Sequence, residues 1–288
     1  MEPQKRIIDE PLSLIREAAR KALKGRMPLA FASALIYMLC VSLPVIIVEQ
    51  ITGLWTFIER ATNEYLAQLS GNPNPASIFE WAQSYEGMGG VSLATFFYLL
   101  LVPGPLTLGI SVIWLQIIRR REAFADMVFS GFGNFLRAML LNFVRCLLMA
   151  LWAILFVIPG IIAYYRYSLA FFLIADNPSM PPFYTINLSK YYMQGNKGNR
   201  FLLDLSFIGW VCVAYIAHSF GGELITAIIA ASGYTVTLFI NLLVSCILGS
   251  AILSPLFAYR CVAAAEYYHR VTCQDPQSFK DPLKLPVT

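Results

Sequence analysis

The sequence predicts an all-α polytopic membrane protein, with six transmembrane helices as three hairpins and with cytoplasmic juxtamembrane amphipathic helices. The first observation behind this fold class is composition: of 288 residues, 58% are hydrophobic and only 13% are charged. A soluble domain carries about twice that share of charged residues, so this chain has too few to cover such a domain's surface. The second observation is a series of long apolar runs, and the third is the unequal placement of basic residues between them.

The apolar runs predict the spans. A helix needs about 20 apolar residues to cross a hydrocarbon core of about 30 Å. Such runs lie at residues 28–48, 91–118, 138–158, 161–175, 201–219 and 238–259. The first follows a long polar segment and has no small-residue cleavage site after it, so we interpret it as a permanent span and not a signal peptide. Pro159-Gly160 is expected to break the helix between the third and fourth runs. The alternative is five spans, with residues 161–175 re-entrant or in the interface.

The basic residues predict the orientation. With six spans and a cytoplasmic N-terminus, 18 of the 21 Lys and Arg residues lie in the cytoplasm, two lie within spans, and only Arg60 lies outside. Basic residues retained in the cytoplasm set orientation, and five spans would place several of them on the wrong side. The predicted divisions are a cytoplasmic basic amphipathic helix at 1–27, a membrane domain at 28–270 with an external loop at 49–90 and cytoplasmic loops at 119–137 and 176–200, and a disordered cytoplasmic tail at 271–288.

Two segments outside the spans have helical periodicity. At residues 12–24 an apolar stripe lies beside a basic face, which is typical of a helix on an anionic membrane surface. The candidate lipid contacts are Arg16, Arg20, Lys21 and Lys24. The alternative is that the apolar stripe packs on the spans. Residues 51–69 predict a helix on the outer interface, and Ser77 with Glu80 forms a capping box that opens another.

The chain also contains a weak internal repeat. Three times a short polar or amphipathic segment reaches a Gly and is followed by a hairpin of spans, in LKGRMPLAFASALIY, FSGFGNFLRAMLLNF and MQGNKGNRFLLDLSF. One interpretation is three tandem units. The other is that every membrane hairpin needs caps and breakers, so that the similarity is generic.

One stretch carries a specific resemblance. Residues 155–210 contain, in order, Pro-Gly-Ile-Ile, Tyr-Ser, Ala-Asp-Asn-Pro, Ser-Lys, Met-x-Gly-Asn-Lys and Asp-Leu-Ser-Phe-Ile-Gly-Trp. This order resembles the family called domain of unknown function 975, whose members are integral membrane proteins, mostly of Gram-positive bacteria. The N-terminal Leu-Lys-Gly and the late Glu-Tyr-Tyr also fit, so the resemblance covers nearly the whole chain. It implies a protein of the bacterial cytoplasmic membrane and brings no activity or catalytic residue; the distribution of basic residues predicts that this multi-pass protein has both termini in the cytoplasm.

The sequence does not favour an enzyme, and it predicts no cofactor or metal site. The two His residues, His218 and His269, are expected at opposite faces of the membrane, and no metalloprotease, hydrolase, P-loop or dinucleotide fingerprint is present. The Gly-rich run at 195–199 lacks the Gly-Lys-Ser/Thr ending of a phosphate loop, so we interpret it as a helix C-cap and loop. The six Cys residues have no CxxC spacing and are interpreted as small apolar residues.

The candidate functional residues are the charges within the spans. An ionisable group at depth is costly and is a functional-site hypothesis by default. The candidates are Arg145, Arg166 and Asp204, with Tyr164 and Tyr167 beside Arg166. The alternative is structural, because all three charges lie close enough to a span end to reach toward polar headgroups. If the third and fifth spans are neighbours, Arg145 and Asp204 are expected to form an ion pair.

These observations predict an integral membrane protein of unknown biochemical activity that is non-catalytic and acts by association with lipids or membrane-protein partners, including further copies of itself. The alternative is a transporter or transporter subunit for an anionic or lipid-like substrate. Nucleic acid is not an expected partner, because the basic residues lie where topology alone would place them.

Overall fold

The computed structural model describes residues 6–51, 93–231 and 238–272. Across this part of the chain the fold is 86% helical, with no strand. Six helical stretches are long and apolar enough to cross a membrane, namely Met27–Ile51, Leu93–Ile118, Ala125–Leu155, Val157–Asp176, Lys197–Ile229 and Phe239–Val271. The all-α class and the six candidate spans are therefore confirmed. The predicted outer helix after Ile51, the capping box at Ser77 and Glu80, and the predicted tail after Thr272 lie outside the described residues.

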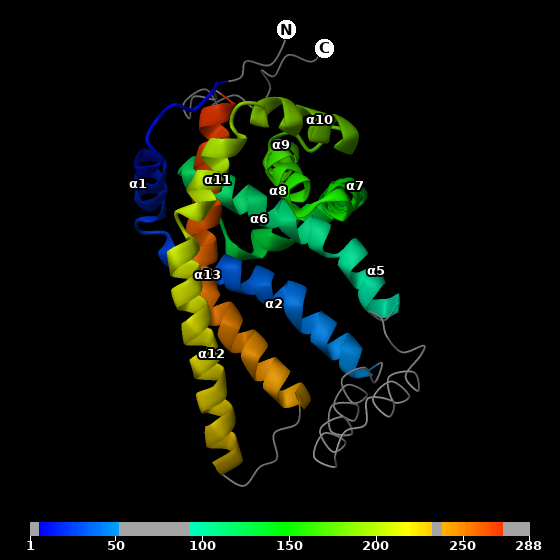
Figure 1. Cartoon of the computed structure of the whole chain (residues 1–288), viewed down its shortest axis with the longest axis vertical. Helices are drawn as coiled ribbons and strands as arrows, with labels where there is room; N and C mark the ends of the chain where they lie inside the picture. Colours follow the sequence, from blue (N-terminus) through cyan, green and yellow to red (C-terminus); the bar gives the residue numbers. More distant parts are fainter. Residues whose placement is uncertain (1–5, 52–92, 232–237, 273–288) are drawn as a thin grey trace.

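The helices gather around α13, the long C-terminal helix (Figure 1). In chain order the elements are α1 (Leu12–Leu23), α2 (Met27–Ile51), α5 (Leu93–Leu101), α6 (Pro103–Ile118), the 3-10 helix η1 (Ala125–Asn134), α7 (Phe135–Leu155), α8 (Val157–Arg166), α9 (Ala170–Asp176), α10 (Pro182–Met193), α11 (Lys197–Leu205), α12 (Ile208–Ala231) and α13 (Leu238–Val271). α1, α2, α6 and α12 all pack against α13. α2 contacts α13 more extensively than it contacts α5 or α6, so the grouping of spans into three hairpins stays a prediction.

The core lies at the end of the molecule where α13 finishes. The side chains of Trp114, Tyr267 and Tyr268 are almost fully buried there. Alanines at positions 263–265 of α13 are also buried, and small residues of this kind let helices approach closely. Pro255, which lies inside α13, cannot donate the usual backbone hydrogen bond, and α13 changes direction along its length (Figure 1).

The third and fourth spans meet at Phe156 and not at Pro159-Gly160, so that prediction is corrected. Phe156 has extended backbone angles (φ −160°, ψ 152°), and α8 begins at the next residue. The physical reason is that a proline is tolerated in the first turn of a helix but clashes with the carbonyl four residues before it, here Leu155. Gly160 serves packing, because a Cβ at this position would lie 2.9 Å from the Cα of Ala153.

The tip of the α7–α8 pair is strongly apolar and exposed. Residues 154–158 include the most exposed large side chains of this region, with Ile154 at 80% and Val157 at 74% of full exposure. A contiguous apolar surface of this kind is unusual for a soluble protein and is typical of contact with a membrane or a partner. α7 is seen nearly end-on in Figure 1, whereas α12 and α13 run along the long axis, so the two pairs point in different directions.

The N-terminal helix α1 is docked on the protein by its apolar stripe. Ile15, Ala19 and Leu23 are buried at intervals of four residues, and α1 packs on α13, α6 and α11. The segment before α1 is also fixed, since Ile8 donates its backbone N–H to Asn196 Oδ1 (3.0 Å) and Asn196 Nδ2 donates to the carbonyl of Arg6 (2.9 Å). The structure thus shows the alternative given above, in which the stripe packs on the spans.

Two of the three predicted repeat units share one conformation. α1 and α10 each have 12 residues, follow an extended proline, and end in a turn residue with nearly the same angles (Lys24 at φ −58°, ψ 121°; Gln194 at φ −69°, ψ 119°). The next residues, Gly25 and Gly195, have φ of +81° and +86°, which completes a type II turn that requires a residue tolerant of positive φ. The buried positions correspond as well: Ile15 with Thr185, Ala19 with Ser189, and Leu23 with Met193.

The middle unit of the predicted repeat is different. Its segment FSGFGN belongs to the 3-10 helix η1, which packs closely on α6. The repeat is therefore a pair, α1–turn–α2 and α10–turn–α11. The middle predicted unit does not belong to it.

Candidate functional site

The six candidate spans converge on one small cavity of about 170 Å³. Each span contributes at least one lining residue, for example Tyr37, Thr107, Arg145, Tyr164, Arg200 and Arg260 in chain order. The aromatic rings of Trp114, Phe171 and Phe257 also line it. We call this the arginine cavity, because Arg145, Arg200 and Arg260 are the charged residues that line it.

Among the described residues, one carboxylate, that of Asp204, lies within ion-pairing distance of these arginines. Asp204 Oδ1 lies 3.1 Å from Nη1 of Arg200, one turn earlier on α11, and 4.0 Å from Nε of Arg260 on α13. The side chains of Arg200 and Asp204 are 7% and 11% exposed. The predicted ion pair between Arg145 and Asp204 is therefore wrong. The physical reason is that Arg200, assigned from sequence to a cytoplasmic loop, stands four residues before Asp204 on the same helix face and takes its carboxylate.

Arg145 forms no ion pair with any described residue. Its guanidinium carbon lies 4.9 Å from the ring centroid of Phe171. Its Nε is buried without a hydrogen-bond partner, and the same is true of Nε of Arg200. Buried donors are nearly always paired in proteins, so the arginines that line this cavity retain two unpaired donor groups and an excess of positive charge.

The neutral lining is amphipathic. Tyr37 and Thr107 share a hydrogen bond of 3.2 Å between their hydroxyl oxygens. Thr107 and Ser111 also bond to carbonyls of the preceding turn of α6, at 2.6 Å and 2.7 Å. Tyr37 stacks on Phe257, with 5.6 Å between ring centroids. A lining that combines hydroxyls with aromatic rings suits a ligand with both polar and apolar parts.

The two repeated units, α1–turn–α2 and α10–turn–α11, differ at the positions of Arg200 and Asp204. Aligning Gly25 with Gly195 places Ala30 of α2 opposite Arg200 of α11, and Ala34 opposite Asp204. Ala30 and Ala34 are fully buried, so the unit packs well with small apolar residues at these positions. Arg200 and Asp204 are therefore not required by the packing of the unit.

Of the remaining sequence candidates, Arg166, Tyr167 and the basic residues of the N-terminal segment lie apart from the arginine cavity. Arg166 is at the end of α8 and lines a different groove, with its guanidinium carbon 5.8 Å from the ring centroid of Trp152. Tyr167 is buried in a second apolar cluster with Leu141 and Phe171. Tyr164 does line the cavity. On α1, the predicted lipid contacts Arg20, Lys21 and Lys24 are exposed and Arg16 is partly buried.

Sequence reasoning missed a second buried charge cluster. Arg119 Nη2 lies 2.7 Å from Asp176 Oδ1, and both side chains are less than a tenth exposed. The Tyr268 hydroxyl donates to Asp176 Oδ2 at 2.7 Å, and Arg119 Nε contacts His269 Nε2 at 3.1 Å. Asp176 belongs to the Ala-Asp-Asn-Pro motif noted above. The cluster joins α6, α9 and α13, and its paired charges are structural in character.

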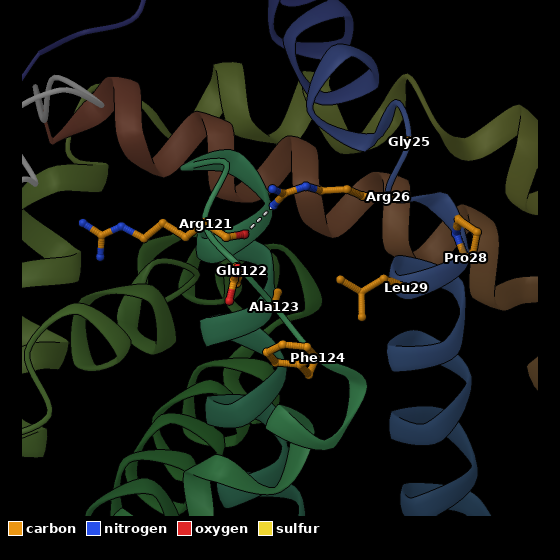
Figure 2. Close-up of a pocket in the computed structure, with 8 residues that line it drawn as sticks. All are labelled: Gly25, Arg26, Pro28, Leu29, Arg121, Glu122, Ala123 and Phe124. Carbon is orange, nitrogen blue, oxygen red and sulfur yellow. Dashed lines mark hydrogen bonds between the residues drawn. The ribbon is translucent and has the colours of Figure 1, made fainter.

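A further hollow of about 440 Å³ lies beside the turn between α1 and α2 (Figure 2). Arg26 donates from Nη1 to the carbonyl of Arg121 at 2.6 Å, whereas the Arg121 guanidinium points away from Arg26. Glu122 supplies a compensating charge in the lining. Neither this hollow nor any other part of the described chain brings together three His, Cys, Asp or Glu side chains that could hold a metal ion.

Comparison with known protein families supports the resemblance over part of the chain. Residues 153–275 match the family described as "Protein of unknown function (DUF975)". The match includes the motifs at 155–210 and the late Glu-Tyr-Tyr, and it therefore confirms the resemblance for these residues; the N-terminal Leu-Lys-Gly lies outside it. Neither the curated proteins nor the solved structures gave a match. The matched residues include Tyr164, Arg200, Asp204 and Arg260 of the site, but not Arg145.

Proposed function

We propose that this integral membrane protein is non-catalytic and binds the anionic head group of a membrane lipid in the arginine cavity. The observation that carries the proposal is the charge balance between the spans. Three arginines line the cavity, one carboxylate lies against two of them, and Arg145 has no carboxylate partner in the part of the chain that the structure describes. An unpaired cation among spans is costly, and an anionic ligand would compensate it.

The size of the cavity favours a head group over a whole metabolite. A cavity needs only about 10–15 Å³ of open space to hold one water molecule, so the space of about 170 Å³ is sufficient for a phosphate group. Pockets for drug-sized ligands begin at about 300 Å³. A lipid phosphate that enters among the arginines, with its acyl chains left among the spans, matches both the charge and the volume.

A transporter of an anionic or lipid-like substrate is the second candidate. The observation in its favour is that every candidate span contributes to the cavity, as in transporters whose substrate sites lie where helices of two halves meet. Flux of a radiolabelled anion or of a fluorescent anionic lipid across proteoliposomes, lost in Arg145→Met, would favour transport. Saturable binding without flux would favour a lipid-binding role.

The proposed setting is the bacterial cytoplasmic membrane, with both termini in the cytoplasm and with membrane lipids, other membrane proteins or further copies of the chain as partners. The asymmetric distribution of Lys and Arg supports this orientation. Single Cys residues introduced at Gly71 and Gln194, in a background without the native cysteines, are expected to react with an impermeant reagent from opposite sides. Reaction of both from one side would overturn the orientation.

Lipid binding can be tested in detergent with the full chain. Native mass spectrometry during titration with short-chain phosphatidylglycerol should show one tightly bound lipid, and phosphatidylcholine should bind more weakly. Arg145→Met should weaken binding by about tenfold or more, since a hydrogen bond to a charged group contributes about 1.5–3 kcal/mol. Arg137→Met is the control, because Arg137 is an exposed cation on the same helix. Equal weakening by both variants would contradict the proposal.

A further inference from the structure

A second cationic hollow, separate from the arginine cavity, lies where α8, α10 and α11 meet. This groove of about 400 Å³ is lined by Arg166, Asn187, Lys190, Tyr191, Gln194 and Lys197. Three of the six lining residues are cations and none is a carboxylate. Apart from Arg166, the lining residues belong to the segment at 176–200, which the sequence predicts to be a cytoplasmic loop.

The geometry of this groove is fixed by local structure. Asn187 lies three and four residues before Lys190 and Tyr191, so these three residues share one face of α10, and Gln194 is the C-cap residue of that helix. The buried Ser189 donates its hydroxyl hydrogen to the carbonyl of Arg166 at 3.0 Å, which ties α10 to the end of α8. The turn at Gly195 then brings Lys197, the first residue of α11, to the same groove.

Helix dipoles account for two of the cations but not for the third. Arg166 and Lys190 lie in the last turns of α8 and α10, where a positive charge is favourable. Lys197 begins α11, where the helix dipole disfavours a cation and favours an anion. Neither Lys190 nor Lys197 forms an ion pair with a described residue. A bound anion would compensate Lys197 and would also use the backbone N–H groups of the first turn of α11.

We propose that this groove binds a phosphomonoester or diphosphate group. Two or three negative charges would match its three cations better than the single charge of a phosphodiester does. The amide groups of Asn187 and Gln194 add neutral hydrogen-bonding partners for the remainder of the ligand. The phosphate can belong to a lipid such as phosphatidic acid or to a soluble compound, since the charged chemistry is shared. The arginine cavity has no part in the proposal, because none of its lining residues lines the groove.

The test uses the full chain in phosphatidylcholine nanodiscs. In one arm inorganic pyrophosphate is titrated calorimetrically, and in the other phosphatidic acid replaces part of the phosphatidylcholine and bound lipid is counted by native mass spectrometry. The test variant is Lys190→Gln with Lys197→Gln. The control is Arg20→Gln with Lys24→Gln, which removes two exposed cations from α1 and its C-cap; α1 is the structural counterpart of α10. All four side chains lie at the surface or partly exposed, and unchanged thermal melting would show that each variant folds.

Saturable binding in either arm, weakened about tenfold or more by the test variant and unchanged in the control, would support the proposal and identify the source of the phosphate. Binding should also persist in Arg145→Met, which separates this groove from the arginine cavity. Absence of binding in both arms, equal loss in the control, or loss in Arg145→Met alone would overturn it.

Discussion

Replacing Gly131 by Ala should destabilise the protein, whereas replacing Gly133 by Ala should not. Gly131 lies in η1 against α6, and a Cβ added there would overlap the carbonyl oxygen of Pro105. It would also lie 2.9 Å from the carbonyl carbon of Pro105 and from the backbone nitrogen of Gly109. At Gly133, two residues later, an added Cβ meets nothing within 4 Å.

The expected magnitude follows from these distances. Carbon atoms in contact lie about 3.5–4.0 Å apart, so η1 or α6 must move by at least about 0.6 Å to accept the Cβ at Gly131. The obstructing atoms are all backbone atoms, which cannot rotate away. Overpacking typically costs about 1–3 kcal/mol, and a clash with rigid backbone belongs at the upper end, near 3 kcal/mol.

Thermal unfolding of the purified protein in detergent measures the difference. At about 2–4 °C per kcal/mol, Gly131→Ala should lower the apparent Tm by about 6–12 °C. Gly133→Ala should leave Tm unchanged or raise it slightly, because Ala restricts the unfolded chain more than Gly does. Equal Tm values for the two variants would refute the close contact between η1 and α6.

Three further outcomes follow from named contacts. Asp176→Asn should cost about 3–5 kcal/mol in thermal stability because Arg119 is left buried without its counter-charge, and the double variant Arg119→Met, Asp176→Leu should recover much of that loss. Lys21 lies 2.8 Å from Glu17 and lowers the pKa of the Glu17 carboxyl from its ordinary 4.5, mainly by a hydrogen bond. The small contribution of this pair to stability is therefore present above pH 4.5 and lost as pH falls through the lowered pKa. NMR titration of Lys21→Gln should show the pKa of Glu17 rising toward 4.5. Arg120 has φ of +52° directly after the C-cap of α6, a conformation that glycine adopts without strain, so Arg120→Gly should keep or raise Tm whereas Arg120→Val should lower it.

The membrane fold could be predicted from sequence because the determining signal is local. Each span is a continuous apolar run, and six such runs appear in the structure as helices. The helix break at Phe156 could not be placed from sequence. A proline disrupts the helix before it but is tolerated in the first turn of a new helix, so the break depends on where α8 begins, which is at Val157. The docking of α1 could not be predicted, since an apolar stripe has the same pattern whether it faces lipid or α13.

The candidate site was predicted only in part, because charge pairing depends on which helix faces meet. The charges of Arg145 and Asp204 are candidates because they lie in apolar runs, and Tyr164 is a candidate because it lies beside Arg166. Arg145 and Tyr164 line the arginine cavity, and Asp204 pairs with two of its arginines. Arg200 and Arg260 were missed, because both were counted as cytoplasmic residues at span ends. One signal was available in the sequence: the spacing of four residues between Arg200 and Asp204, which places both on one helix face.

The most direct test of the proposed function is the density inside the arginine cavity in an experimental map of the protein in nanodiscs that contain phosphatidylglycerol. The account predicts a phosphate-sized feature within hydrogen-bonding distance of Nε of Arg145 and Nε of Arg200, continuous with lipid density among the spans. Density for ordered water alone, or a side chain of the protein that occupies the cavity and pairs with Arg145, would contradict it.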